Sequence, residues 1–118
     1  NVGLGTDVGA GTSFSLLNTL NEAYKVMQLQ GARLHPYKSL YLATLGGARA
    51  LRLDDRIGSL RPGNDADFVV LDYKATPLLD YRIQQSNSIE ETLFVLTTLG
   101  ADRTVRETYA AGRCVHQR

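Results

Sequence analysis

The sequence contains no tryptophan, a single methionine, three prolines and one cysteine, Cys114. One cysteine excludes an internal disulfide framework and is typical of a reducing compartment, so we expect a cytoplasmic location. No apolar run approaches the ~18–20 residues that a membrane-spanning helix needs. The sequence therefore predicts neither a disulfide-stabilised secreted domain nor a membrane protein.

An excess of charge of one sign is also missing. Thirteen Lys and Arg residues face twelve Asp and Glu residues, which gives a net charge of +1. Nucleic acids and anionic membranes attract proteins through basic clusters, and the sequence has none, so we expect neither as a partner. With 118 residues, of which 43% are hydrophobic and 21% charged, the composition is that of an ordinary globular domain.

The first helix is predicted over residues 14 to 30. Apolar side chains recur there at spacings of three and four, which gives one apolar face. These are Phe14, Leu17, Leu20, Tyr24 and Met27. Thr12 or Ser13 can cap this helix, and Gly31 is placed to end it.

Two further helices are predicted. One begins at Pro36, which suits a first helical turn, and continues to about residue 53. Gly46 and Gly47 in its middle are unfavourable in a helix and predict a close backbone approach or a break. The other begins after Ser88 with a capping-box pattern and ends at Gly100. Its predicted apolar stripe is Ile89, Leu93, Leu96 and Leu99.

Strands are predicted at residues 2–6 and 68–71, and a hairpin at residues 104–109 and 113–116. The run Phe-Val-Val-Leu at 68–71 is continuously apolar, which is typical of a strand covered on both faces. Residues 74–87 show no periodicity and are predicted to be irregular. The fold class is therefore mixed α/β, and a strand that ends in an acid and leads into a helix is typical of one unit of a (β/α) fold.

The glycine-rich start of the chain does not have the spacing of a phosphate-binding loop. The G-x-G-x-x-G pattern needs a glycine where the sequence has Val8 or Phe14. Asp7 is the candidate for chemistry, because a carboxylate at the C-terminal end of a barrel strand can bind a metal or take a proton from water. The alternative is a turn aspartate that bonds its own backbone.

Other residues give no complete site. His35 and His116 lack the spacing of a zinc site, which needs three or four protein ligands, and Cys114 near His116 is too little for one. The acids that follow Leu53 and flank the 68–71 strand are most simply solvated turn residues. No Ser/His/Asp set can be assigned.

Three segments resemble guanine deaminases, a family of metal-dependent amidohydrolases. GLGTDVGAGTSFSLLNTLNEAYKVMQLQ at 3–30 resembles the last barrel strand and the following helix. YLATLGGARALRLDDRIGSLRPGNDADFVVLDY at 41–73 is similar to the passage into the small β-sandwich, and TVRETYAAGRCV at 104–115 to its closing hairpin. The resemblance implies the C-terminal part of a (β/α)8 barrel at residues 1–56 and a β-sandwich remnant with one helix at 57–118.

The resemblance also implies a role for Asp7. In the family, the matching aspartate coordinates zinc or a similar divalent metal and accepts a proton from the attacking water. Hydroxide replaces the amino group of guanine, which yields xanthine and ammonia. Asp7 is therefore expected to be both a metal ligand and a catalytic residue.

The family's other metal ligands and its acid/base glutamate do not occur in this sequence. We therefore expect a C-terminal piece of a longer enzyme that alone is metal-free and inactive. Apolar helix faces without their usual neighbours predict self-association, hence a homo-oligomer, or disorder of residues 1–12. Two alternatives stay open: an aminohydrolase of the same superfamily with a different heterocyclic substrate, and a non-catalytic interaction module.

Overall fold

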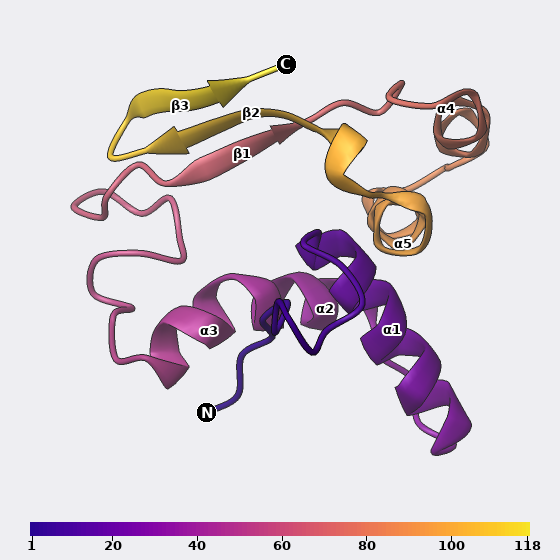
Figure 1. Cartoon of the computed structure of the whole chain (residues 1–118), viewed down its shortest axis with the longest axis horizontal. Coiled ribbons are helices and arrows are strands. Elements are labelled where there is room, and N and C mark those ends of the chain that lie inside the picture. The colour runs from indigo at the N-terminus through magenta and orange to yellow at the C-terminus, as the bar shows by residue number, and fades with distance from the viewer.

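Three helices lie together on one side of the molecule, and a small sheet with two more helices lies on the other (Figure 1). The computed structural model describes all 118 residues. The elements are α1 (Leu16–Leu29), α2 (Pro36–Ala43), α3 (Leu45–Ala50), β1 (Phe68–Leu71), α4 (Pro77–Gln84), α5 (Ile89–Leu99), a 3₁₀ turn (Asp102–Thr104), β2 (Val105–Ala110) and β3 (Arg113–Gln117). The prediction of a mixed α/β fold is confirmed.

Helix α1 forms where its periodicity predicts it. Leu20, in the middle of the apolar face, is fully buried. Gly31 follows the helix with a φ of +75°, a left-handed conformation that glycine adopts without steric cost. The start differs slightly from the prediction. Ser15 is the N-cap residue but its side chain makes no capping bond, and the Ser13 hydroxyl instead accepts the backbone N–H of Ser15 at 3.0 Å.

The predicted second helix is divided into α2 and α3 at Thr44. This residue has φ −128° and ψ −102°, outside the helical region, and its hydroxyl donates to the carbonyl of Leu40 at 2.7 Å. Gly46 lies against Tyr41 so closely that a Cβ on Gly46 would stand 2.8 Å from the Tyr41 carbonyl oxygen. The glycine pair thus marks both a close approach and a break in the helix.

The prediction that residues 74–87 are irregular is wrong, because α4 occupies most of that segment. The hydroxyl of Thr76 accepts the backbone N–H of Leu79 at 3.2 Å, and Pro77 occupies the first helical position. Both residues favour a helix start, and these signals outweigh the missing periodicity. Leu79 is fully buried and packs with Val95 and Leu96 of α5.

Helix α5 begins and ends as predicted, but its buried face differs. The Ser88 hydroxyl accepts the backbone N–H of Glu91 at 3.1 Å, so the capping interaction is confirmed. The predicted stripe is wrong at both ends, since Ile89 is 58% and Leu99 36% exposed. The buried residues of the helix are Val95, Leu96 and Thr97. Helix α5 contacts α1, α2 and α4, and this shared contact decides which side chains are covered.

The sheet is antiparallel with the order β1-β2-β3. The predicted hairpin is confirmed, and its turn residues Ala111 and Gly112 both have positive φ, as tight hairpin turns require. The expectation that β1 is covered on both faces is wrong. Phe68 and Val69 are exposed, because β2 is the only element in extensive contact with β1 and no second layer covers these side chains. Phe68 is partly covered by Tyr109, with ring centroids 4.4 Å apart.

The predicted strand at residues 2–6 is also wrong, since this segment is extended but belongs to no sheet. A β-strand needs a neighbouring strand to bond its backbone groups. The backbone N–H of Leu4 instead donates to the carbonyl of Leu42 in α2 at 3.0 Å.

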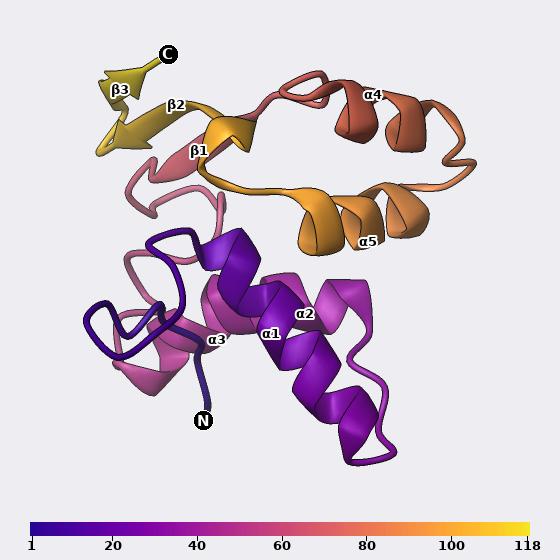
Figure 2. The same cartoon turned by 45° about the vertical axis from the view of Figure 1, so that its right-hand side comes forward.

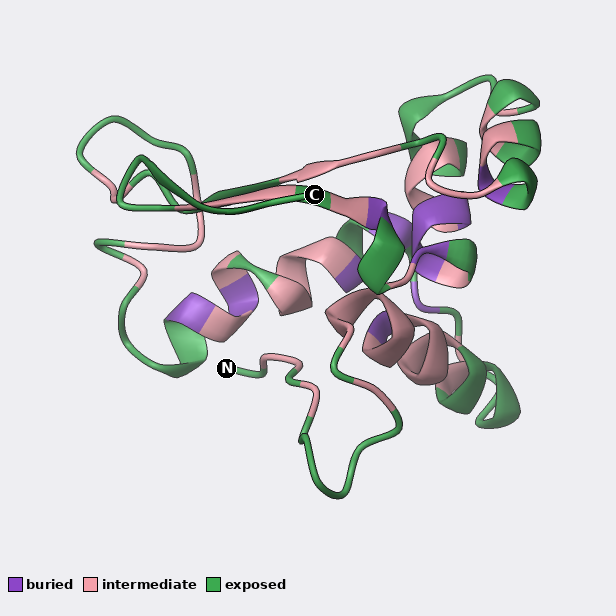
Figure 3. Cartoon of the chain, turned by 45° about the horizontal axis from the view of Figure 1, so that its top comes forward, coloured by how far each residue is buried: buried purple, intermediate pink, exposed green.

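Buried residues concentrate on the helices, whereas the β2–β3 hairpin is largely exposed (Figure 3). Only 12 of the 118 residues are buried, so the core is small and centres on the contacts of α5. None of the helices combines the length and the hydropathy that crossing a bilayer requires.

Candidate functional site

The segment that leads to Asp7 lies across the junction of α2 and α3, below the start of α1 (Figure 2). One anchor is the hydrogen bond from Leu4 to Leu42 described above. The other is a backbone approach between Gly3 and Gly47. A Cβ on Gly3 would stand 2.5 Å from the Cα of Gly47, a distance that no side chain tolerates. The path of the chain before Asp7 is therefore fixed by α2 and α3.

Asp7 opens a tight turn, called here the Asp7 turn (residues 7–11). Its backbone has a φ of +48°, and its carbonyl accepts the backbone N–H groups of Ala10, at 3.0 Å, and of Gly11. Gly9, with a φ of +106°, allows the chain to reverse. The carboxylate of Asp7 is exposed and makes no hydrogen bond or ion pair within the chain. The turn is thus closed by the backbone, and the carboxylate remains available.

The residues around Asp7 do not form a metal site by themselves. No three His, Cys, Asp or Glu side chains in the structure lie close enough together to hold a metal ion. A zinc site needs three or four protein ligands, and Asp7 supplies one. The donor set of this chain therefore does not fit a complete metal centre, although one free carboxylate oxygen donor is present.

The two histidines lie outside the Asp7 turn. His35 is the N-cap residue of α2, where its Nδ1 accepts the backbone N–H of Tyr37 at 3.4 Å. Its Nε2 lies 2.9 Å from a carboxylate oxygen of Glu90 on α5. His116 lies in β3 and is exposed, as is Cys114. His35 thus serves as a helix cap, and neither histidine joins Asp7 in a group of three or more metal-ligating side chains.

The acids near the turns and strand ends serve mainly to hold loops. Asp65 pairs with Arg56 at 3.0 Å, and Asp72 pairs with Arg118 at 2.7 Å. The carboxylate of Asp67 accepts the backbone N–H of Ala111 at 2.8 Å. These contacts are partly or fully exposed, so each contributes little to stability, and they account for the acids without catalysis.

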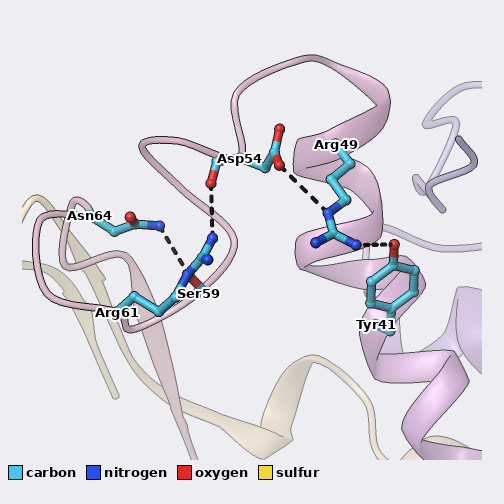
Figure 4. A network of polar contacts seen from close by, with 6 residues as sticks. All are labelled: Tyr41, Arg49, Asp54, Ser59, Arg61 and Asn64. Carbon is cyan, nitrogen blue, oxygen red and sulfur yellow. Dashed lines mark hydrogen bonds and ion pairs between the residues drawn. The ribbon is translucent and has the colours of Figure 1, made fainter.

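A network centred on Arg49 organises the loop after α3 (Figure 4). The guanidinium of Arg49 donates to the hydroxyl of Tyr41 at 3.2 Å and lies 3.5 Å from the carboxylate of Asp54. The bond to Tyr41, with a smaller effect of Asp54, raises the pKa of Arg49 above its ordinary value. Arg61 continues the network, since it donates to the carbonyl of Asp54 at 3.4 Å and to the Ser59 hydroxyl at 3.1 Å. Periodicity gives no signal for this network, whose contacts join residues two to eight positions apart.

A hollow of about 470 Å³ lies between α1, the start of α2 and the α4–α5 connection. Its apolar wall consists of Tyr24, Leu34, Phe94 and Val95. Arg33, His35, Arg82 and Glu90 are among its polar residues. No residue of the Asp7 turn lines it, so it is separate from the carboxylate on which the sequence-based prediction depends.

Comparisons with known proteins give a consistent result. Residues 1–115 match the model of the amidohydrolase family. The guanine deaminase of Escherichia coli K12 is 58% identical over 117 residues, which cover 99% of this chain and 27% of that protein. The solved E. coli guanine deaminase has a TM-score of 0.96. The chain thus spans about a quarter of the length of this relative.

Two other solved structures are more distant. The guanine deaminase from C. acetobutylicum, with guanine bound in its active site, is 26% identical and has a TM-score of 0.70, with 98% of this chain and 27% of that chain covered. An adenosine deaminase from Xanthomonas campestris, with bound zinc, is 28% identical and has a TM-score of 0.66, with 84% of this chain and 21% of that chain covered.

Proposed function

This chain belongs to the amidohydrolase family, and we propose that it is a portion of a guanine deaminase that hydrolyses guanine to xanthine and ammonia. The observation that carries the proposal is the 58% identity over 99% of the chain to the E. coli enzyme, together with a TM-score of 0.96. Similarity of this extent over a whole segment supports the same reaction as well as the same fold.

The proposed role of Asp7 is to accept a proton from the attacking water and to provide one of several metal ligands. An exposed carboxylate without an internal partner is suited to both tasks. Its turn is closed by backbone bonds, so the side chain does not have to hold the loop. We propose zinc or a similar divalent ion, whose chemistry when bound is to lower the pKa of water. The zinc in the Xanthomonas structure supports this choice.

The chain supplies a single ligand, and for that reason the 118 residues alone are proposed to be inactive and to bind metal poorly. Further ligands and the group that protonates the leaving ammonia belong to the longer proteins that the relatives represent. We also propose that residues 1–56 belong to the barrel of such a protein and residues 57–118 to its β-sandwich. The grouping of α1 to α3 apart from the sheet supports this division. A homo-oligomer in the cytoplasm is proposed as the setting.

Guanine is favoured over another heterocycle by the comparisons. The adenosine deaminase covers less of this chain than the E. coli guanine deaminase, at 84% against 99%, with a TM-score of 0.66 against 0.96. An interaction module without catalysis remains the alternative from another class. It would need neither the free carboxylate of Asp7 nor a longer enzyme around it.

A chimera tests the proposal. The region of the E. coli guanine deaminase that matches this chain is replaced by residues 1–118, and the loss of guanine is measured by its ultraviolet absorbance. The chimera is expected to deaminate guanine, and Asp7→Asn in the chimera is expected to lower kcat by at least about 100-fold, the scale of losing a catalytic acid–base group. Adenosine serves as the competing substrate.

The matched control is Asp55→Asn, because Asp55 is an exposed aspartate that makes no bond within the chain. This variant should keep the activity of the parent chimera. A folded chimera that ignores guanine, or an Asp7→Asn variant as active as Asp55→Asn, would contradict the proposal. Guanine turnover by the isolated 118-residue chain would contradict the proposed need for further ligands.

A further inference from the structure

The Asp7 turn is closed by a glycine that has no room for a side chain. A Cβ built on Gly11 would stand 1.9 Å from the carbonyl oxygen of Thr6 and 3.0 Å from that of Asp7. Gly11 does not have a positive φ, so its backbone conformation is open to alanine. Position 11 therefore requires glycine because a side chain has no room there, and not because of the backbone conformation.

The forbidden contact at Gly11 falls on the backbone next to Asp7, the residue with the proposed catalytic role. The backbone N–H of Gly11 donates to the carbonyl of Asp7, and the forbidden Cβ would push against Thr6, the residue directly before Asp7. A side chain on Gly11 would have to displace the peptide unit between Thr6 and Asp7. That peptide unit sets the direction in which the Asp7 Cα–Cβ bond leaves the backbone.

Gly3 acts on the same segment from its other end. Its approach to Gly47 and the bond from Leu4 to Leu42 fix where the chain enters the turn. Like Gly11, Gly3 does not have a positive φ. The segment is therefore held at both ends by backbone contacts, while the carboxylate in its middle is free of any.

We propose that Gly11 and Gly3 are positioning residues for Asp7, which hold its carboxylate where it receives the proton of the attacking water. This inference rests on the proposed function. Misplacing a reacting group by about 1 Å can cost on the order of 100-fold in rate. The forbidden contacts at both glycines would require shifts of about that size.

Gly5 offers a matched control between them. It lies in the same extended segment, has no positive φ, and has no atom within 4 Å of a built Cβ. Gly3→Ala, Gly5→Ala and Gly11→Ala therefore add the same methyl group to one segment and differ in the atoms of this chain that the methyl group meets.

The three variants are made in the chimera described above, and kcat and KM for guanine are measured with the melting temperature. Gly11→Ala and Gly3→Ala should lower kcat about 100-fold with KM changed less than about 3-fold, whereas Gly5→Ala should keep both values. Active-site titration with a tight-binding inhibitor counts the folded enzyme, so that kcat refers to the folded fraction. A variant that only weakened the fold would lower the melting temperature and the amount of active enzyme without changing this kcat.

Equal kcat values for all three glycine variants would overturn the inference, as would a loss confined to KM. If Gly11→Ala fails to fold, Gly3→Ala carries the same expectation and the same refutation. Asp7→Asn separates the two proposals. An active Asp7→Asn chimera refutes the proposed role of Asp7, whereas an inactive one with fully active Gly11→Ala and Gly3→Ala refutes only the positioning role.

Discussion

The side-chain amide of Asn21 on α1 donates to the backbone carbonyl of Thr98 on α5 at 3.2 Å, across 77 positions of sequence. One turn earlier along α5, Phe94 meets the ring of Tyr24 edge to face, with centroids 5.2 Å apart. The positions 94 and 98 lie four residues apart, so both contacts come from one face of α5. Asn21 and Tyr24 belong to the segment 3–30 that resembles guanine deaminases, and here they join α1 to α5.

The turn after α3 predicts a stabilising substitution. Arg52 has a φ of +58°, and the backbone N–H groups of Arg52 and Leu53 donate to the carbonyls of Arg49 and Ala48. This is the arrangement that closes many helices, with glycine as the usual residue at the Arg52 position. Arg52→Gly should raise the free energy of unfolding by ~1 kcal/mol, because glycine adopts positive φ without a steric cost.

Chemical denaturation of the 118-residue chain at one fixed protein concentration measures this change. Arg33→Gly is the control, since Arg33 is also an exposed loop arginine but has no positive φ. It should be neutral or destabilising, because glycine adds conformational freedom to the unfolded chain. An Arg52→Gly chain no more stable than the parent would show that the Arg52 side chain contributes contacts that offset the backbone strain.

Two N-cap serines predict losses of stability of different size. The hydroxyl of Ser88 accepts the backbone N–H of Glu91 at the start of α5, whereas Ser15 at the start of α1 makes no capping bond. Ser88→Ala should lower the free energy of unfolding by about 1 kcal/mol, the typical loss of an N-cap bond. Ser15→Ala should change the free energy of unfolding by only a few tenths of the change expected for Ser88→Ala. Thermal unfolding followed by circular dichroism compares them, and equal shifts would contradict this assignment of caps.

Tyr109 predicts a dependence on alkaline pH. Its hydroxyl donates to the carboxylate of Glu107 at 2.9 Å, and this bond, followed by the repulsion between the two negative charges, raises the pKa of Tyr109 above its ordinary value of about 10. The protonated tyrosine is thus favoured in the folded chain. Its contribution to stability is complete below about pH 10 and is lost as the pH rises through the raised pKa.

Ultraviolet titration of tyrosinate in the folded chain measures this effect. Tyr109 should contribute a step above the ordinary pKa of tyrosine, and Tyr109→Phe should remove that step. Glu107→Gln should move the step to lower pH, since the amide carries no charge. A titration curve that is the same in Glu107→Gln as in the parent would contradict the proposed cause.

Local signals predicted the elements whose ends are fixed by neighbouring residues. Ser88 begins α5, Gly31 ends α1, and Ala111 with Gly112 turns the hairpin, and each acts through backbone groups within a few positions. Helix α4 was equally predictable in principle, because Thr76 caps it and Pro77 opens it. The lack of a clear period in its apolar side chains favours an irregular segment, but the capping signals of a helix do not depend on such a period.

Contacts between distant segments could not be predicted in the same way. The exposure of Phe68 and Val69 in β1 depends on which elements lie nearby. The extended segment at 2–6 is also decided by its surroundings, since a sequence with strand propensity forms a ladder only where a partner strand is present.

For the candidate site, the residue types alone specify the acid, the glycines around it and the resemblance on which the proposed role of Asp7 rests. The tertiary structure decided how that acid is held. Gly3 meets Gly47, Leu4 bonds Leu42, and Gly11 closes the turn against Thr6. The physical reason is the distance along the sequence over which each contact acts. The sequence shows each residue and its nearest neighbours, whereas the backbone that packs against a glycine comes from other parts of the chain and is known only in the folded structure.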